Sequence, residues 1–117
     1  MEFKTKSKLD KEKRKEQSQK LLTNYPDQVP VILEKDPSSK IQELKKINFL
    51  LEKKSTVNQF IQFIRRKTNL KEGEALFLQA KGKYGISGEK NFGDIYNEYK
   101  DDDGFLYIMY ATELIYG

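Results

Sequence analysis

Six consecutive apolar or aromatic residues, from Phe105 to Tyr110, constrain the fold more than any other stretch of the chain. The run is too short for a buried helix and is made of residues that favour strands, so it predicts a fully buried strand. An acidic turn at 101–104, closed by Gly104, leads into it. The fold must therefore contain a sheet in which this segment takes a central position.

Gly117 lies a few residues beyond the predicted strand, at the end of the chain. Because glycine has no Cβ, a narrow enzyme channel can thread the last peptide and allow attack on its carboxyl carbon. The alternative is that Gly117 is only the point at which the chain stops. The terminus alone does not decide between the two interpretations.

The chain contains neither cysteine nor histidine. This composition excludes disulfides, thiolate nucleophiles, imidazole bases and nearly all zinc sites. No pair of carboxylates is placed as acid and base, and the acidic run at 101–103 is more typical of a turn than of a metal site. We therefore expect no enzymatic activity, no cofactor and no metal.

A length of 117 residues predicts a single domain. No apolar segment approaches the ~20 residues of a membrane span, and the first residues lack the apolar stretch of a signal peptide. We therefore expect a cytosolic or nuclear protein. The net charge of +4 permits attraction to anionic surfaces but is too small to indicate nucleic-acid binding by itself.

Residues 1–27 form a lysine-rich extension in which a helix is predicted from Lys11, with Asp10 as its N-cap and Pro26 beyond its end. The helix is polar on nearly every side apart from Leu21 and Leu22. We therefore expect it to lie on the surface of the remaining domain and to touch it lightly. Its lysines either form a solvated face or contact anionic lipid or acidic tubulin tails.

The periodicity of residues 28–117 predicts four strands, at 28–35, 48–52, 75–80 and 105–110, a helix from Ser55 or Thr56 to Lys67, and a short helix at 92–100 capped by Asn91. A four-stranded mixed sheet crossed by one packed helix is an α+β arrangement, and this order is the ubiquitin-like β-grasp. The segment 81–90 is predicted to be a loop. Its glycines resemble a phosphate loop only superficially, because the Lys-Ser/Thr ending is missing.

The predicted strand at 48–52 carries apolar side chains on both faces. A period of two places Phe49 and Leu51 on one face and Leu50 on the other. At the edge of a sheet such a strand exposes apolar side chains and unpaired backbone groups, which favours aggregation unless a partner binds there. Pro30, on the preceding strand, cannot donate to a ladder and so lacks a partner on one side.

Several blocks of sequence together resemble one known family, namely 13–15 (KRK), 29–35 (VPVILEK), 56–60 (TVNQF), 64–67 (IRRK), 95–101 (IYNEYKD) and 103–107 (DGFLY). They are similar to the autophagy ubiquitin-like modifiers, a family that includes the GABA-receptor-associated protein and the microtubule-associated light chains. The resemblance runs from about residue 12 to the end, with one apparent insertion near the glycine-bearing loop.

The resemblance implies a β-grasp core with two added N-terminal helices. It also implies that E1-like and E2-like enzymes activate Gly117 and join it to phosphatidylethanolamine, and that a cysteine protease removes the lipid. Since nothing follows Gly117, the chain would be either made in its mature form or trimmed to it. The expected protein is a cytoplasmic monomer that moves to autophagosome and vesicle membranes when lipidated.

The resemblance further implies that cargo receptors and adaptors with aromatic-x-x-aliphatic motifs add a strand to the edge at 48–52. Lys46 and Arg65 would meet acidic residues that flank the motif. The first pocket, for the aromatic residue, would be formed by Gln17, Leu21, Pro30, Ile32, Leu50 and Phe105. The second pocket, for the aliphatic residue, would be formed by Phe49, Leu51, Phe60, Phe63 and Ile64.

The chain departs from the family pattern at several positions. Gln17 stands where Glu is usual, and Gln28 and Asn48 replace common basic residues, so we expect a weaker preference for acidic flanks. Lys11 replaces an aromatic residue that anchors the first helix, which predicts looser packing of the N-terminal segment. Ser55 replaces an aliphatic residue at the rim of the second pocket, which predicts a shallower or more polar pocket.

One alternative of a different class remains open. The chain would then be an unconjugated β-grasp binding domain for acidic partners, such as tubulin, an anionic membrane or nucleic acid, and Gly117 would be incidental.

Overall fold

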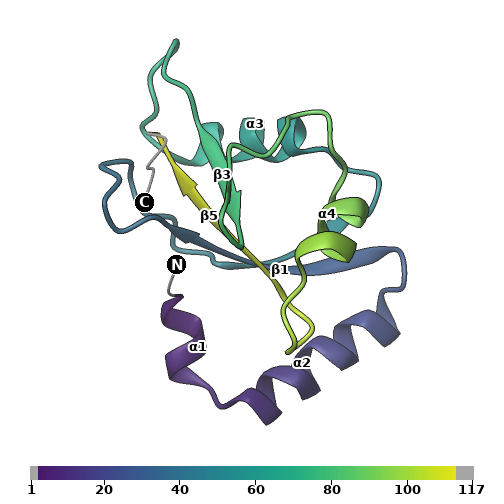
Figure 1. Ribbon diagram of the computed structural model, residues 1–117. Helices are drawn as coiled ribbons and strands as arrows, with labels where there is room; N and C mark the ends of the chain where they lie inside the picture. Colours follow the sequence, from purple (N-terminus) through teal and green to yellow (C-terminus); the bar gives the residue numbers. More distant parts are fainter. Residues whose placement is uncertain (1–2, 113–117) are drawn as a thin grey trace.

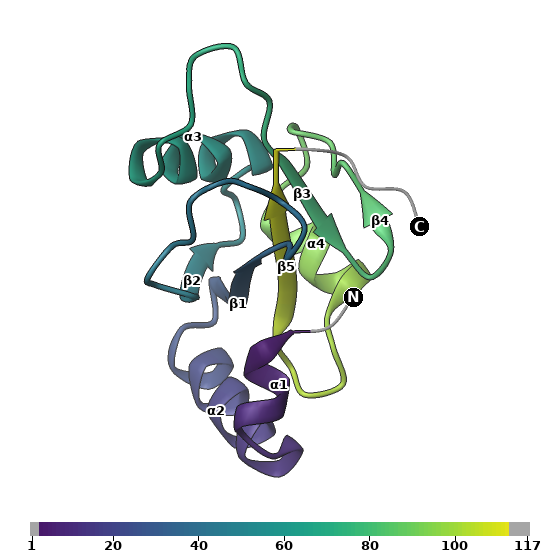
Figure 2. The same ribbon diagram turned by 90° about the vertical axis from the view of Figure 1, so that its left-hand side faces the viewer.

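The computed structural model describes residues 3–112, which form one five-stranded sheet in the order β2-β1-β5-β3-β4 with helices on both of its faces (Figures 1 and 2). The elements in chain order are α1 (Lys4–Lys8), α2 (Lys11–Asn24), β1 (Gln28–Lys35), β2 (Asn48–Glu52), α3 (Val57–Lys67), β3 (Phe77–Ala80), β4 (Lys83–Tyr84), α4 (Phe92–Tyr99) and β5 (Leu106–Ala111). The predicted β-grasp with added N-terminal helices is confirmed.

β5 is the central strand that the apolar run predicted. It pairs in parallel with β1 and antiparallel with β3, and all of its residues are buried. Leu106, Ile108 and Tyr110 face the larger core, and Tyr107 and Met109 face a smaller cluster on the other side of the sheet. The strand is apolar throughout because both faces are covered, rather than alternating as a half-exposed strand would.

The helices α3 and α4 cover the face of the larger core. α3 buries Val57, Phe60 and Ile64, the stripe that its helical period predicted. Thr56 caps the helix, and its side chain and that of Gln59 form a reciprocal capping box. α4 begins after Asn91, whose side chain accepts a hydrogen bond from the backbone N–H of Asp94, as the sequence predicted.

The two-residue strand β4 was not predicted, so the sheet has five strands rather than four. The turn between β3 and β4 consists of Lys81 and Gly82, both with positive φ (39° and 80°), and it brings Tyr84 opposite Gln79. Positive φ at both central positions is typical of the tight turns that join hairpin strands. A strand this short has no period that a sequence pattern can reveal.

The helix α2 is held to the sheet by a buried ion pair, so the expectation of a light contact was wrong. Arg14 Nε donates to Asp103 Oδ2 at 2.8 Å, and Ser18 Oγ donates to the backbone carbonyl of Asp103 at 2.5 Å. Asp103 is only 1% exposed. A polar helix can therefore be fixed firmly, because buried polar groups that pair with one another need no apolar face.

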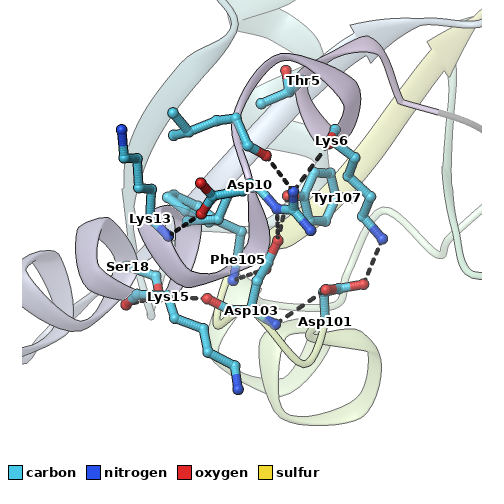
Figure 3. A network of polar contacts seen from close by, with 12 residues as sticks. Thr5, Lys6, Asp10, Lys13, Lys15, Ser18, Asp101, Asp103, Phe105 and Tyr107 are labelled. Atoms are coloured by element: carbon cyan, nitrogen blue, oxygen red, sulfur yellow. Dashed lines mark hydrogen bonds and ion pairs between the residues drawn. The ribbon is translucent and has the colours of Figure 1, made fainter.

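The Asp103 carboxylate accepts two further hydrogen bonds, from Tyr107 Oη at 2.5 Å and from the backbone N–H of Phe105 at 2.9 Å (Figure 3). Burial raises the pKa of Tyr107, and the hydrogen bond to Asp103 raises it further. The hydrogen bond to Asp103 also raises the pKa of Arg14. The guanidinium therefore stays charged, and the carboxylate has a donor on each of its oxygens.

The short helix α1 is also anchored, so the looser packing expected from Lys11 is not observed. The ring of Phe3 lies 5.0 Å from that of Tyr107, and the Glu34 carboxylate accepts hydrogen bonds from the backbone N–H groups of Lys4 and Thr5. Phe3 is buried and packs in the smaller cluster with Tyr107. Glu34 caps a helix whose own N-cap residue provides no side-chain hydrogen bond.

A salt bridge between Lys6 Nζ and Asp101 Oδ1, at 2.6 Å, ties α1 to the turn before β5. Burial alone would raise the pKa of Asp101. Hydrogen bonds from Lys6 and from the backbone N–H of Asp103 outweigh it and hold the pKa below its ordinary value. Both N-terminal helices are therefore attached to the same turn.

Replacing Ile108 with alanine should lower the free energy of unfolding by about 2–5 kcal/mol, because it removes apolar contacts and leaves a cavity in the larger core. Urea denaturation followed by circular dichroism measures the change. Ile61→Ala is the matched control, because Ile61 is only half-buried at the margin of the same core. Equal losses for the two variants would contradict the burial of β5.

Replacing Tyr107 with phenylalanine should change how stability depends on alkaline pH. Above the ordinary tyrosine pKa of about 10, the unfolded chain loses this proton while the folded protein keeps it, so wild-type stability falls by up to about 1.4 kcal/mol per pH unit. The variant lacks this contribution. The difference in unfolding free energy between the two proteins should therefore shrink from pH 8 to pH 11. Urea denaturation measures this difference at each pH. A difference that stays constant over this range would contradict the raised pKa of Tyr107.

Candidate peptide-binding site

The outer edge of β2 is open for pairing with another strand. β2 lies at one end of the sheet and pairs antiparallel with β1. Just before β2, Ile47 O accepts a hydrogen bond of 2.8 Å from Leu33 N on β1, and this bond shows which positions of β2 face β1. Because paired positions alternate along an antiparallel ladder, Asn48 and Leu50 turn their backbone N–H and C=O groups away from β1. These two residues form the edge that a further strand would meet.

A first hollow of about 530 Å³ lies between α2 and the edge of β2. Its apolar residues include Leu21 on α2, Leu50 on β2 and Phe105, which comes just before β5. Its full lining is Gln17, Lys20, Leu21, Val31, Lys46, Asn48, Phe49, Leu50 and Phe105. Four of the six residues predicted for the first pocket are thus brought together.

The other two predicted residues of the first pocket lie beneath this surface. Ile32 is 1% exposed and packs in the smaller cluster with Phe105. Pro30 is also buried, opposite Leu50 on β2. The parallel pairing of β1 with β5 starts at Val31, so the missing N–H of Pro30 falls just before that ladder begins.

A second hollow of about 220 Å³ lies on the other face of β2, against α3, and is lined by Phe49, Leu51, Ser55, Gln59, Phe60 and Phe63. The Phe49 ring meets Phe60 and Phe63 edge-on, with centroids 5.3 and 5.6 Å away. Ile64, also predicted for this pocket, is fully buried in the core. Gln59 was not predicted, although its position one turn before Phe63 on α3 could have indicated it.

The polar groups at the rim of the second hollow already have partners. Ser55 Oγ donates to the Glu52 carbonyl at 2.6 Å, and Gln59 Oε1 accepts from Thr56 N at 2.9 Å. Phe49, Leu51, Phe60 and Phe63 supply the apolar part of this hollow, and Ser55 and Gln59 supply its polar part.

Lys46 lies at the site, and Arg65 does not. Lys46 Nζ sits 4.9 Å from the centroid of Phe49 and lines the first hollow. The Arg65 guanidinium instead donates to the backbone carbonyls of Lys71 and Glu74, in the loop after α3.

Two cations at the site were missed. Lys20 lines the first hollow, and Lys67 Nζ lies 5.9 Å from the centroid of Phe63. Helical spacing could have found both, because Lys20 is three residues from Gln17 and Lys67 is four residues from Phe63. The site is therefore more basic than Gln17 and Asn48 suggest.

A third hollow lies between the loop at 42–46 and α3. It shares Phe49 and Phe63 with the second hollow and Lys46 and Phe49 with the first, and Lys67 also lines it. Phe49 lines all three. The arrangement combines apolar hollows on both sides of an edge strand with lysines beside them. Within residues 3–112 no cluster of side chains is arranged to hold a metal ion, and no helix there could cross a membrane. Gly117 lies outside the described residues.

Comparisons with known proteins show the family to which this chain belongs. The family described as "Autophagy protein Atg8 ubiquitin like" matches residues 13–117. Autophagy-related protein 8e of Arabidopsis thaliana is 36% identical over 108 residues, covering 92% of this chain and 88% of that protein. The crystal structure of Trypanosoma brucei ATG8 superposes with a TM-score of 0.89 at 34% identity and covers 100% of both chains. This chain therefore belongs to the ATG8 family of ubiquitin-like autophagy proteins.

Proposed function

We propose that this protein is a modifier that is conjugated through Gly117 to phosphatidylethanolamine and then acts as a membrane-bound adaptor, not as an enzyme. As an adaptor it binds aromatic-x-x-aliphatic motifs by strand addition to β2. The observation that carries the proposal is an open edge strand with one apolar hollow on each of its faces.

The spacing of the motif fits the two hollows. In an extended peptide successive side chains point to opposite faces, so residues three positions apart point to opposite sides of the sheet. Leu50 lines only the first hollow and Leu51 only the second, and these neighbouring residues of β2 point to opposite faces, while Phe49 lines both hollows. A span of three residues covers about 10 Å along a strand, which allows one motif to reach both hollows.

The sizes of the hollows favour one direction of the motif. The first hollow, of about 530 Å³, has room for an aromatic anchor, and the second, of about 220 Å³, suits an aliphatic side chain. Lys20, Lys46 and Lys67 are placed to meet acidic residues next to the anchors. Arg65 lines none of the three hollows, and its guanidinium contacts the loop after α3, so we expect a smaller contribution from it than from these lysines.

Membership of the ATG8 family supports conjugation at Gly117 by E1-like and E2-like enzymes and removal of the lipid by a cysteine protease. The two acyl chains of a phospholipid provide a stable anchor where one myristoyl chain gives only marginal membrane binding. The protein would thus be a cytoplasmic monomer before conjugation and would lie on autophagosome and vesicle membranes afterwards. We also propose that the extension at 1–27 and the core at 28–117 act as one compact domain.

Replacing Leu50 with alanine should weaken binding of a Trp-x-x-Leu peptide by about 1–3 kcal/mol, because it removes an apolar wall of the first hollow. Isothermal titration calorimetry measures the affinity. Leu70→Ala makes the same change outside the hollows and should leave the affinity unchanged. Unchanged affinity of the Leu50 variant would contradict strand addition at this edge.

Deleting Gly117 should abolish membrane association in cells, because the conjugated carboxyl group is lost. Fractionation and imaging measure the membrane-bound pool, and mass spectrometry tests for a phospholipid adduct on the last residue. The Leu50→Ala protein serves as the control, since it should keep the adduct while losing motif binding. Unchanged membrane puncta after the deletion would favour the unconjugated binding domain.

A further inference from the structure

We propose that Asp103 is a positioning residue for the first hollow, because it fixes α2 and Phe105, two walls of that hollow, relative to one another. The inference rests on the proposed motif binding at this hollow. It assigns a recognition role to a buried carboxylate that lies outside the lining of the hollow itself.

The first wall, α2, depends on Asp103 for its attachment. Residues 11–20 contain no apolar side chain, so this part of the helix cannot be held by hydrophobic packing. Arg14 and Ser18 are its buried residues, and both hydrogen bond to Asp103. Gln17 and Leu21, which line the hollow, each follow one of these residues by three positions and so lie next to it on the helix surface.

The second wall, Phe105, is bound to the same carboxylate. The Phe105 backbone N–H donates to Asp103 Oδ1 at 2.9 Å, and Tyr107 Oη donates to Oδ2 at 2.5 Å. Figure 3 shows Ser18, Phe105 and Tyr107 converging on Asp103 from both sides of the turn. One side chain therefore connects the helix wall and the aromatic wall of the hollow.

Gly104 allows α2 to lie directly against the turn, because it has no side chain. It has φ +90°, and a Cβ atom at this position would lie 2.3 Å from Ser18 Oγ. The backbone of the turn and α2 are therefore in direct contact, while the ion pair of Arg14 and Asp103 keeps the helix from moving away. The position of α2, and with it the width of the first hollow, is set from both directions.

This attachment should affect the first anchor of a bound motif and not the second. A wall that is fixed in advance need not be ordered on binding, and this lowers the entropic cost of association. The second hollow is formed by residues of β2 and α3 and by Ser55, which lies between them. The hydrogen bonds of Asp103 go to none of the residues that line this hollow. Loosening the Asp103 contacts should thus act through the first anchor alone.

The test is a thermodynamic cycle between protein and peptide variants. The proteins are wild type, Arg14→Gln and Ser18→Ala, with Lys13→Gln as the control that removes one charge from α2 without touching Asp103. The peptides are a Trp-x-x-Leu motif and versions in which either the Trp or the Leu is alanine. Calorimetry measures the tighter complexes, and NMR titration measures the weaker ones.

We expect Arg14→Gln to lower the affinity for the parent peptide and for the Leu-to-Ala peptide by about tenfold each. Its affinity for the Trp-to-Ala peptide should stay within about twofold of that of the wild-type protein. Ser18→Ala keeps the ion pair and should show the same pattern at about threefold. Lys13→Gln should affect all three peptides equally.

An equal loss for all three peptides with Arg14→Gln and Ser18→Ala, or no loss with either, would overturn the positioning role. In both cases wild type would still bind the parent peptide, so the proposed function would stand. If wild type does not bind the parent peptide, the proposed function fails, and the inference fails with it. Ser18→Ala removes only one hydroxyl group. Its binding data therefore test the positioning role of Asp103 even if the Arg14→Gln protein fails to fold.

Discussion

The burial of β5 on both faces is the constraint on which the rest of this structure depends. A strand whose residues are all buried needs a layer over each face of its sheet. The helices α3 and α4 provide one layer through apolar packing, and α1 and α2 provide the other. Since most of α2 is polar, its layer is attached by paired and buried polar groups around Asp103. The two layers are held by different physical means.

The candidate site lies where these two layers meet the open edge of β2. The first hollow is bounded by α2, from the layer that polar groups attach, and the second by α3, from the layer that packs through apolar side chains. Phe49 lines both hollows. An edge strand with covered faces on each side can take one extended peptide and two side chains at once. If this edge binds a motif as proposed, its specificity would depend on how each layer is attached, and the buried network around Asp103 would then contribute to recognition.

Local pattern was enough to predict most of the elements. β1 and β2 have the predicted bounds, and Asp10 and Asn91 cap α2 and α4 as the sequence predicted, because alternation and capping chemistry are local. β4 was missed because two residues carry no period. The orientation of Arg65 was also missed, because it depends on a loop nine residues further along the chain.

The sequence by itself determined the fold class, the central strand, the family, and most of the residues at the two hollows. The fold class and the central strand follow from periodicity, the family follows from its blocks of sequence, and the residues at the hollows follow from the resemblance to that family. The tertiary structure alone decided that Asp103 binds Arg14, that Pro30, Ile32 and Ile64 lie beneath the hollows, and that Lys67 rather than Arg65 stands beside them. The reason is physical, because these contacts join segments that are distant in sequence, and their geometry exists only once the sheet has formed.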